Sequence, residues 1–244
     1  MRRAAFDLAS TTPWLGARHS AFALSMACAA AASPVRMSPR TNRLPVGRRY
    51  GSTVAMCSGS GSGKDSVHVA LCQTPVTSDK NINIATAREA IRTAASQGAE
   101  LIILPEIWNG PYATSAFPKY AESVPGGEST AMLSAIAKEQ NIWLIGGSIS
   151  ERDFDGSIYN TCTIFNPNGE LVAKHRKVHL FDIDVPGKIS FKESDTLTGG
   201  NKITVFDTPF GRVGVGICYD IRFPELAQLM REKGAVILAY PGKS

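Results

Sequence analysis

Short apolar runs alternate with longer amphipathic segments along the chain after residue 66. Val67–Gln73 is too short and too apolar for an amphipathic helix, which predicts a buried strand. Asp79–Gln97 places apolar side chains at helical spacing, and Gly98 ends the predicted helix. Glu100–Leu104 is apolar after its first residue, which is typical of a strand buried on both faces. The pattern therefore predicts a sheet covered by helices.

The remaining pattern combines further units of this kind with hairpins. Pro167-Asn168-Gly169 and Pro209-Phe210-Gly211 are turn signals, and each lies between two strand-like runs that we expect to pair antiparallel. The predicted elements are a helix at Ser129–Gln140 with Ser129 as its cap, strands at Ile142–Gly146, Ser157–Asn166, Glu170–His175, Ile203–Asp207 and Arg212–Ile217, a helix at Pro224–Lys233 and a strand at Ala235–Ala239. We expect an α/β fold whose sheet has parallel and antiparallel parts.

Positive charge is concentrated at the N-terminal end. Of 244 residues, 1–64 contain nine Lys or Arg and one acidic residue, for a net charge of +8 in a chain whose total is +5. Residues 65–244 therefore carry a net charge of −3, which does not predict a nucleic-acid-binding surface.

Residues 1–64 are rich in Arg, Ser and Ala, which is typical of a transit peptide followed by a flexible linker. The apolar run Ala21–Ala32 is shorter than the roughly 20 residues that span a bilayer, although it has the length of a secretory signal core. Val54–Cys57 resembles a stromal processing site. We expect import into the chloroplast, with the mitochondrion as the alternative, no membrane association, and one folded domain at 65–244.

The five cysteines and four histidines are scattered, with no CxxC pair and no spacing typical of a metal site. We expect no disulfide framework, no metal and no cofactor. Gly59–Lys64 resembles a phosphate-binding loop superficially, but it lacks the first Gly of that motif and is followed by Asp65 instead of Ser or Thr.

Three segments place a reactive side chain near the end of a predicted strand, where a sheet can fix its position. Glu106 follows an apolar strand and suits a general base, although a solvated loop acid is the alternative. Lys174–Asp182 contains five basic or imidazole side chains, which form either a solvated face or a site where a Lys stabilises an oxyanion. Cys218 ends an apolar, Gly-spaced strand just before a helix. That setting suits a nucleophile whose thiolate is favoured, although an inert buried thiol is the alternative.

Together these segments resemble the nitrilase superfamily of carbon–nitrogen hydrolases. Leu104-Pro105-Glu106, Arg176-Lys177-Val178-His179-Leu180-Phe181-Asp182 and Gly216-Ile217-Cys218-Tyr219-Asp220-Ile221-Arg222-Phe223-Pro224-Glu225 match its Glu–Lys–Cys motifs. The residues of these motifs, together with Val185–Ser194, are most similar to the omega-amidase branch. The resemblance implies a four-layer α-β-β-α sandwich.

The resemblance also implies a mechanism. Glu106 takes the proton of Cys218, and the thiolate attacks an amide carbonyl. Lys177 and the backbone N–H of Tyr219 stabilise the oxyanion, ammonia leaves, and water hydrolyses the thioester with Glu106 as base. Glu193 matches a supporting glutamate that positions Lys177.

For substrates, the branch implies small dicarboxylic monoamides such as 2-oxoglutaramate and 2-oxosuccinamate. Arg222 matches a carboxylate-binding arginine and Tyr112 a tyrosine near the acyl pocket, although a structural salt bridge and a core aromatic are the alternatives. An N-carbamoyl amide hydrolase of the same superfamily is the alternative activity.

Members of this branch continue beyond Tyr240-Pro241-Gly242 with Ala-Phe-Asn, whereas Lys243-Ser244 follow here. We therefore expect a domain that is incomplete at its C-terminal end, and a truncated non-catalytic product is an alternative to an enzyme. The family also implies a homodimer if the fold is intact.

Overall fold

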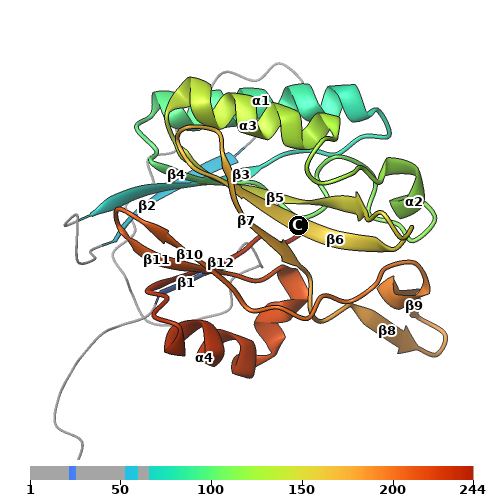
Figure 1. Cartoon of the computed structure of the whole chain (residues 1–244). Coiled ribbons are helices and arrows are strands. Elements are labelled where there is room, and N and C mark those ends of the chain that lie inside the picture. The colour runs from blue at the N-terminus through green and yellow to red at the C-terminus, as the bar shows by residue number, and fades with distance from the viewer. Residues whose placement is uncertain (1–21, 26–52, 60–65, 244) are drawn as a thin grey trace, which may run out of the picture.

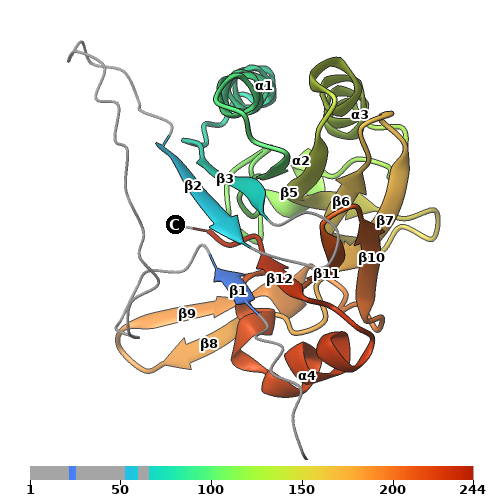
Figure 2. The same ribbon diagram turned by 90° about the vertical axis from the view of Figure 1, so that its left-hand side faces the viewer.

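The computed structural model describes residues 22–25, 53–59 and 66–243, which form four layers (Figure 1). Two helices cover one face of a six-stranded sheet, a four-stranded sheet packs on its other face, and one helix covers the far side of the second sheet (Figures 1 and 2). This α-β-β-α order is the architecture that the family resemblance implies.

The six-stranded sheet has the order β2-β3-β4-β5-β6-β7. Its strands are β2 (Thr53–Gly59), β3 (Val67–Gln73), β4 (Leu101–Ile103), β5 (Trp143–Arg152), β6 (Ile158–Phe165) and β7 (Leu171–Arg176). β3, β4 and β5 run parallel, and β2, β6 and β7 add antiparallel pairs. The sheet is therefore mixed, as expected.

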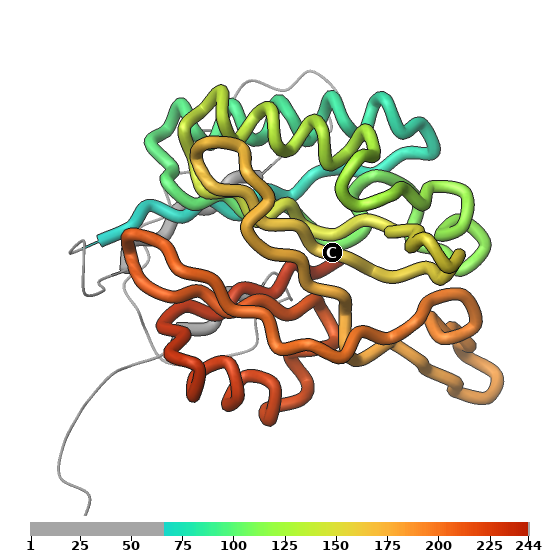
Figure 3. The backbone as a smooth tube through the Cα atoms, in the orientation of Figure 1, coloured from blue at the N-terminus to red at the C-terminus, as the bar shows by residue number. Residues whose placement is uncertain are grey.

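The four-stranded sheet has the order β1-β12-β11-β10, and a separate hairpin is formed by β8 and β9. The strands are β1 (Phe22–Ser25), β8 (Asp182–Val185), β9 (Ile189–Lys192), β10 (Thr204–Thr208), β11 (Gly211–Val215) and β12 (Ile237–Tyr240). β10 and β11 are antiparallel, while β11 and β12 are parallel. The β8–β9 hairpin projects from one end of the layers (Figure 3).

The helices are α1 (Lys80–Ser96), α2 (Phe117–Tyr120), α3 (Glu128–Gln140) and α4 (Pro224–Glu232), with short 3₁₀ helices η1 (Glu193–Asp195) and η2 (Cys218–Arg222). The Asp79 side chain accepts hydrogen bonds from the N–H groups of Asn81 and Ile82, so it caps α1. Within residues 66–243 no helix is long and apolar enough to cross a membrane.

Three apolar cores hold the layers together. Ile91 of α1 and Leu133 of α3 pack on the six-stranded sheet, and Leu226 and Met230 of α4 pack on the four-stranded sheet. The core between the sheets includes Leu101, Ile103, Ile145, Ile164, Phe206, Val213, Val215 and Ile217. Truncation of one such buried aliphatic side chain to Ala costs about 2–5 kcal/mol.

Most predicted elements are present within a few residues of their expected bounds, but two features differ. Ser129 lies inside α3, whose cap position is Gly127, so the predicted Ser129 cap is wrong. The carboxylate of Glu122 instead accepts the backbone N–H and the hydroxyl of Ser129, at 2.8 and 2.7 Å, and so satisfies this helix end. Three pieces of strand structure were not predicted: the β8–β9 hairpin, and β1 and β2, which lie within the expected transit peptide and linker at 1–64. The rest of that segment lies outside the described residues.

Candidate active site

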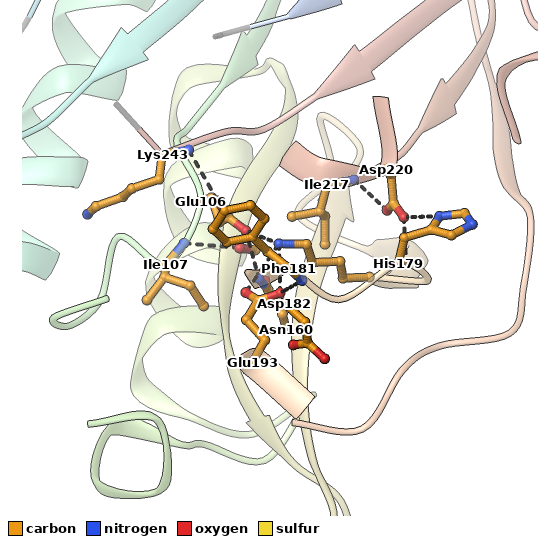
Figure 4. Close-up of polar contacts among 12 residues, drawn as sticks. Glu106, Ile107, Asn160, His179, Phe181, Asp182, Glu193, Ile217, Asp220 and Lys243 are labelled. Carbon is orange, nitrogen blue, oxygen red and sulfur yellow. Dashed lines mark hydrogen bonds and ion pairs between the residues drawn. The ribbon is translucent and has the colours of Figure 1, made fainter. Parts of the chain in front are cut away.

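Glu106 lies just beyond the end of β4 and is fully buried. Its backbone N–H donates to the carbonyl of Gly242 at 3.3 Å, which ties it to the segment after β12. Oε1 accepts hydrogen bonds from Lys177 Nζ at 2.8 Å and Asn160 Nδ2 at 2.9 Å (Figure 4). Oε2 accepts the backbone N–H of Lys243 at 3.2 Å. The carboxylate therefore accepts hydrogen bonds from three groups in three parts of the chain.

Lys177 follows β7 and is fully buried between two carboxylates. Its Nζ lies 2.8 Å from Glu106 Oε1 and 3.0 Å from Glu193 Oε2. Burial lowers the pKa of this ammonium, but the charges of Glu106 and Glu193 outweigh burial, so the pKa lies above its ordinary value. Lys177 is therefore a permanent cation at neutral pH, as oxyanion stabilisation requires.

Glu193 begins η1 and is also fully buried. Besides Lys177, its carboxylate accepts the hydroxyl of Tyr112 at 2.7 Å and the backbone N–H of Phe181 at 2.7 Å. The donors Tyr112 and Phe181 fix the orientation of the Glu193 carboxylate. The carboxylate in turn holds the Lys177 ammonium in one place.

Cys218 starts η2, directly after a buried apolar residue, and its backbone has φ of 43°. Only a minority of non-Gly residues adopt this left-handed conformation, and such residues cluster at functional sites. The Cys218 N–H donates to the carbonyl of Pro241 at 2.8 Å. The strand-to-helix turn expected from the sequence is therefore present, with a 3₁₀ helix as its second element.

The protonation state of Cys218 differs from the expectation of a favoured thiolate. Burial and then the negative charge of Glu106 raise the pKa of the thiol, Lys177 lowers it, and the net value is about 12. The resting thiol is protonated at neutral pH. A nucleophilic role would therefore require a base that removes the proton during the reaction, and Glu106 is near enough to supply one.

Asp220 connects the Cys218 turn to the segment that carries Lys177. It is fully buried, and its carboxylate accepts the N–H of Ile217 at 2.9 Å and the N–H and Nδ1–H of His179 at 2.8 Å each (Figure 4). It also accepts Nε2–H of His175 at 3.2 Å. Burial raises the pKa of Asp220. The hydrogen bond and charge of His175 and two backbone N–H groups lower it by more than burial raises it, so the pKa lies below its ordinary value.

The substrate-binding residues expected from the sequence occupy different settings. Tyr112 contacts Glu193 through its hydroxyl and stacks on Phe191 at 5.4 Å. Tyr219 packs edge-on against Phe181 and Phe223. Arg222 is exposed at the end of η2, and among the described residues no hydrogen bond or ion pair joins it to another group.

Two polar residues of this site were not predicted from the sequence. Asn160 lies inside β6, and the sequence pattern that predicts this strand does not indicate a polar contact with Glu106. Asp220 belongs to a quoted motif but was assigned no role, and its position two residues after Cys218 was the available signal. In residues 66–243 no cluster of His, Cys, Asp and Glu could hold a metal ion.

A half-buried thiol, a buried carboxylate and a buried ammonium lie together where two sheets of an α-β-β-α sandwich meet. Amide hydrolysis through a covalent intermediate needs groups of these three kinds. The family model "Carbon-nitrogen hydrolase" matches residues 68–244. The chain therefore belongs to the carbon–nitrogen hydrolase family.

Two relatives and one solved structure show the relationship in more detail. The chain is 57% identical over 179 residues to the chloroplastic omega-amidase of Arabidopsis thaliana, covering 72% of this chain and 48% of that protein. It is 56% identical over 174 residues to omega-amidase NIT2 of Mus musculus, covering 71% and 62%. Nit3 of Saccharomyces cerevisiae, a nitrilase superfamily member, superposes with a TM-score of 0.62 at 42% identity, covering 69% and 61%. The chain thus spans about half to less than two thirds of the length of these proteins.

Proposed function

We propose that this protein is an omega-amidase that hydrolyses the terminal amide of small dicarboxylic monoamides such as 2-oxoglutaramate and 2-oxosuccinamate. Cys218 attacks the amide carbonyl, Glu106 transfers the proton, and Lys177 with the backbone N–H of Tyr219 stabilises the oxyanion. The observation that carries the proposal is the position of Lys177 Nζ, 2.8 Å from Glu106 and 3.0 Å from Glu193. The similarity to two omega-amidases at 56–57% identity supports the choice of substrate.

The electrostatics support a sequence of proton transfers. Because the pKa of Cys218 is about 12, the thiol cannot supply a useful thiolate at neutral pH without a base. Proton transfer to Glu106 forms the thiolate as it attacks the carbon atom, and the C–S bond forms while the carbonyl oxygen becomes negative beside Lys177. Glu106 then donates this proton to the departing nitrogen, so ammonia leaves and a thioester remains.

The thioester is resolved by the reverse use of the same groups. Glu106 accepts a proton from water, the resulting hydroxide attacks the thioester carbonyl, and Lys177 again lies beside the oxyanion. Collapse of this intermediate breaks the C–S bond and returns the proton to the Cys218 thiolate. The products are a dicarboxylate and ammonia, and no redox partner or metal takes part in these steps.

Ammonia release from 2-oxoglutaramate by the purified 244-residue chain tests this function. N-carbamoyl compounds in parallel reactions test the alternative activity, and Cys218→Ala supplies the blank. Turnover of monoamides that disappears in the blank is the expected result. A chain that melts cooperatively but releases ammonia from neither class would support the non-catalytic alternative and contradict the proposal.

We further propose that the protein acts in the chloroplast and forms a homodimer. The first rests on the sequence of residues 1–64 and on the chloroplastic relative at 57% identity. A fluorescent protein fused after residue 64 should enter chloroplasts in plant cells, and entry into mitochondria would contradict this. One chain has a mass of 26.1 kDa before processing, and light scattering of the purified protein should give twice the mass of one chain.

A further inference from the structure

Asn160 is the residue that contacts both the base and the cation of the proposed mechanism. It is fully buried in β6. Its Nδ2 donates to Glu106 Oε1 at 2.9 Å, and its backbone carbonyl accepts the N–H of Lys177 at 2.8 Å. The side chain therefore acts on the carboxylate of Glu106 (Figure 4), while the main chain fixes the residue that provides the ammonium.

The two oxygens of Glu106 have different surroundings. Oε1 receives two side-chain donors at 2.8 and 2.9 Å, from Lys177 and Asn160. Oε2 receives one backbone N–H, from Lys243, at the longer distance of 3.2 Å. Each carboxylate oxygen has about two lone-pair sites, so Oε1 is filled and Oε2 keeps room for one further proton. Oε2 is therefore the oxygen that can accept the proton of Cys218.

We propose that Asn160 is a positioning residue that fixes which oxygen of Glu106 accepts and returns the proton. Rotation about the last bond of a Glu side chain has only broad, two-fold preferences, so the carboxylate does not hold one orientation by itself. Lys177 cannot fix it alone, because an ammonium is a point charge with rotating donors. The planar amide of Asn160 adds a second donor from a fixed direction. This inference rests on the proposed function and assigns a new role within it.

The pairing of the Asn160 amide also favours this role. In a buried amide that serves packing alone, both ends usually find partners. Here the direction of the amide is settled, because a carboxylate can only accept and so must face Nδ2. Asn160 Oδ1 has no hydrogen-bond partner among the described residues. Within residues 66–243, the hydrogen bond that this side chain makes is the one to Glu106.

Asn109 provides a matched control in the same chain. It is fully buried, its Oδ1 also has no partner among residues 66–243, and its Nδ2 donates to the carboxylate of Glu122 at 3.2 Å and to the carbonyl of Tyr120 at 3.3 Å. Glu122 caps α3 and does not contact Lys177 or Glu193 through any recorded bond. Asn109→Ala therefore removes the same kind of contact from a structural carboxylate.

The test uses the full 244-residue chain and the burst of p-nitrophenolate released from p-nitrophenyl acetate. This leaving group needs no proton, so the burst rate reports removal of the Cys218 proton and attack, independently of the amide specificity. We expect Asn160→Ala to slow the burst by about 10- to 100-fold, part of the contribution that a general base makes. KM for the monoamide should change little, and Asn109→Ala should keep the wild-type burst rate whatever its melting temperature.

Asn160→Asp gives a second result that packing alone cannot produce. The new side chain has the same shape but places a second carboxylate against Oε1 at neutral pH, so we expect a slower burst than in Asn160→Ala. When the pH falls far enough to protonate the new carboxyl, that group donates a hydrogen bond to Oε1, so the ratio of its burst rate to that of wild type at the same pH should rise. A pH-independent ratio, or a wild-type burst rate in both variants, would overturn the positioning role. No burst from wild-type Cys218 would instead overturn the proposed function.

Discussion

The carboxylate of Asp220 accepts two hydrogen bonds from His179, one from its backbone N–H and one from its ring Nδ1, each at 2.8 Å. His179 follows Lys177 by two residues and Asp220 follows Cys218 by two, so this pair joins the turn of the proposed nucleophile to the segment of the proposed oxyanion cation. The imidazole also stacks on Phe223, with ring centroids 3.6 Å apart, which fixes its plane.

Asp220→Asn should destabilise the protein because an amide presents two N–H groups where the carboxylate accepts four hydrogen bonds. We expect a loss of about 3–5 kcal/mol at pH 7, as for other broken buried ion pairs. The folded-state pKa of Asp220 lies below the ordinary value of 3.8, so its contribution is present above that value and is lost as the pH falls through the folded pKa. Urea unfolding should therefore show a smaller difference between variant and wild type near pH 3 than at pH 7.

Removal of the Lys177 ammonium should be costly because two buried carboxylates would then face each other. We expect Lys177→Met to abolish turnover and to destabilise the fold by about 3–5 kcal/mol. The double variant Lys177→Met with Glu193→Gln leaves one carboxylate, so it should be more stable than Lys177→Met alone. A thermodynamic cycle of the three variants measures the coupling, and additive changes would contradict it.

Glu106→Gln should separate the charge of Glu106 from its action as a base. Glu106 raises the pKa of Cys218, so its neutral replacement should lower that pKa from about 12. Turnover should nevertheless fall by about 10²- to 10⁴-fold, because the proton acceptor is lost. Thiolate absorbance near 240 nm, with Cys218→Ala as the blank, reports the pKa. Glu151→Gln is the control, since Glu151 is buried and paired with Lys174 and Arg176 elsewhere.

Arg222 should matter only for substrates that carry a carboxylate. Its guanidinium is exposed and can form a bidentate pair with a bound carboxylate. We expect Arg222→Ala to raise KM for 2-oxoglutaramate by about 10- to 100-fold, the range of a charged hydrogen-bonded pair, with little change for a simple aliphatic amide. Arg231→Ala, at an exposed position of α4, is the matched control. Equal effects on both substrates would show that Arg222 does not bind the carboxylate.

The parts of the fold that follow from local pattern were predicted well. Val67–Gln73 forms a strand with the predicted bounds, and Asp79 caps a helix that ends before Gly98. Periodicity and caps depend on neighbouring residues, so one sequence suffices to show them. Ser129 was assigned as a cap by the same logic and is not one. It lies inside α3, and Glu122, six residues before that helix begins, satisfies its end instead.

The tertiary contacts of the site could not be derived in this way. Resemblance to a family brought Glu106, Lys177 and Cys218 together before any geometry was known. The contact of Asn160 could not be predicted, because its partner Glu106 is 54 residues away in sequence and the pattern of its strand does not distinguish it from other strands. The raised pKa of Cys218 was also missed, because burial and the charge of Glu106 outweigh Lys177 only in the folded arrangement.

The segment after β12, residues 241–243, determines how this protein would lose activity as it unfolds. Pro241 and Gly242 accept the backbone N–H groups of Cys218 and Glu106, and Lys243 donates to the Glu106 carboxylate, so three consecutive residues hold the proposed nucleophile and base together. Glu106 extends from one sheet, and this segment continues a strand of the other. If the two sheets separated, these hydrogen bonds would break and the site would lose its geometry even while each sheet stayed folded. Loss of turnover during gradual denaturation would therefore mark the separation of the two sheets.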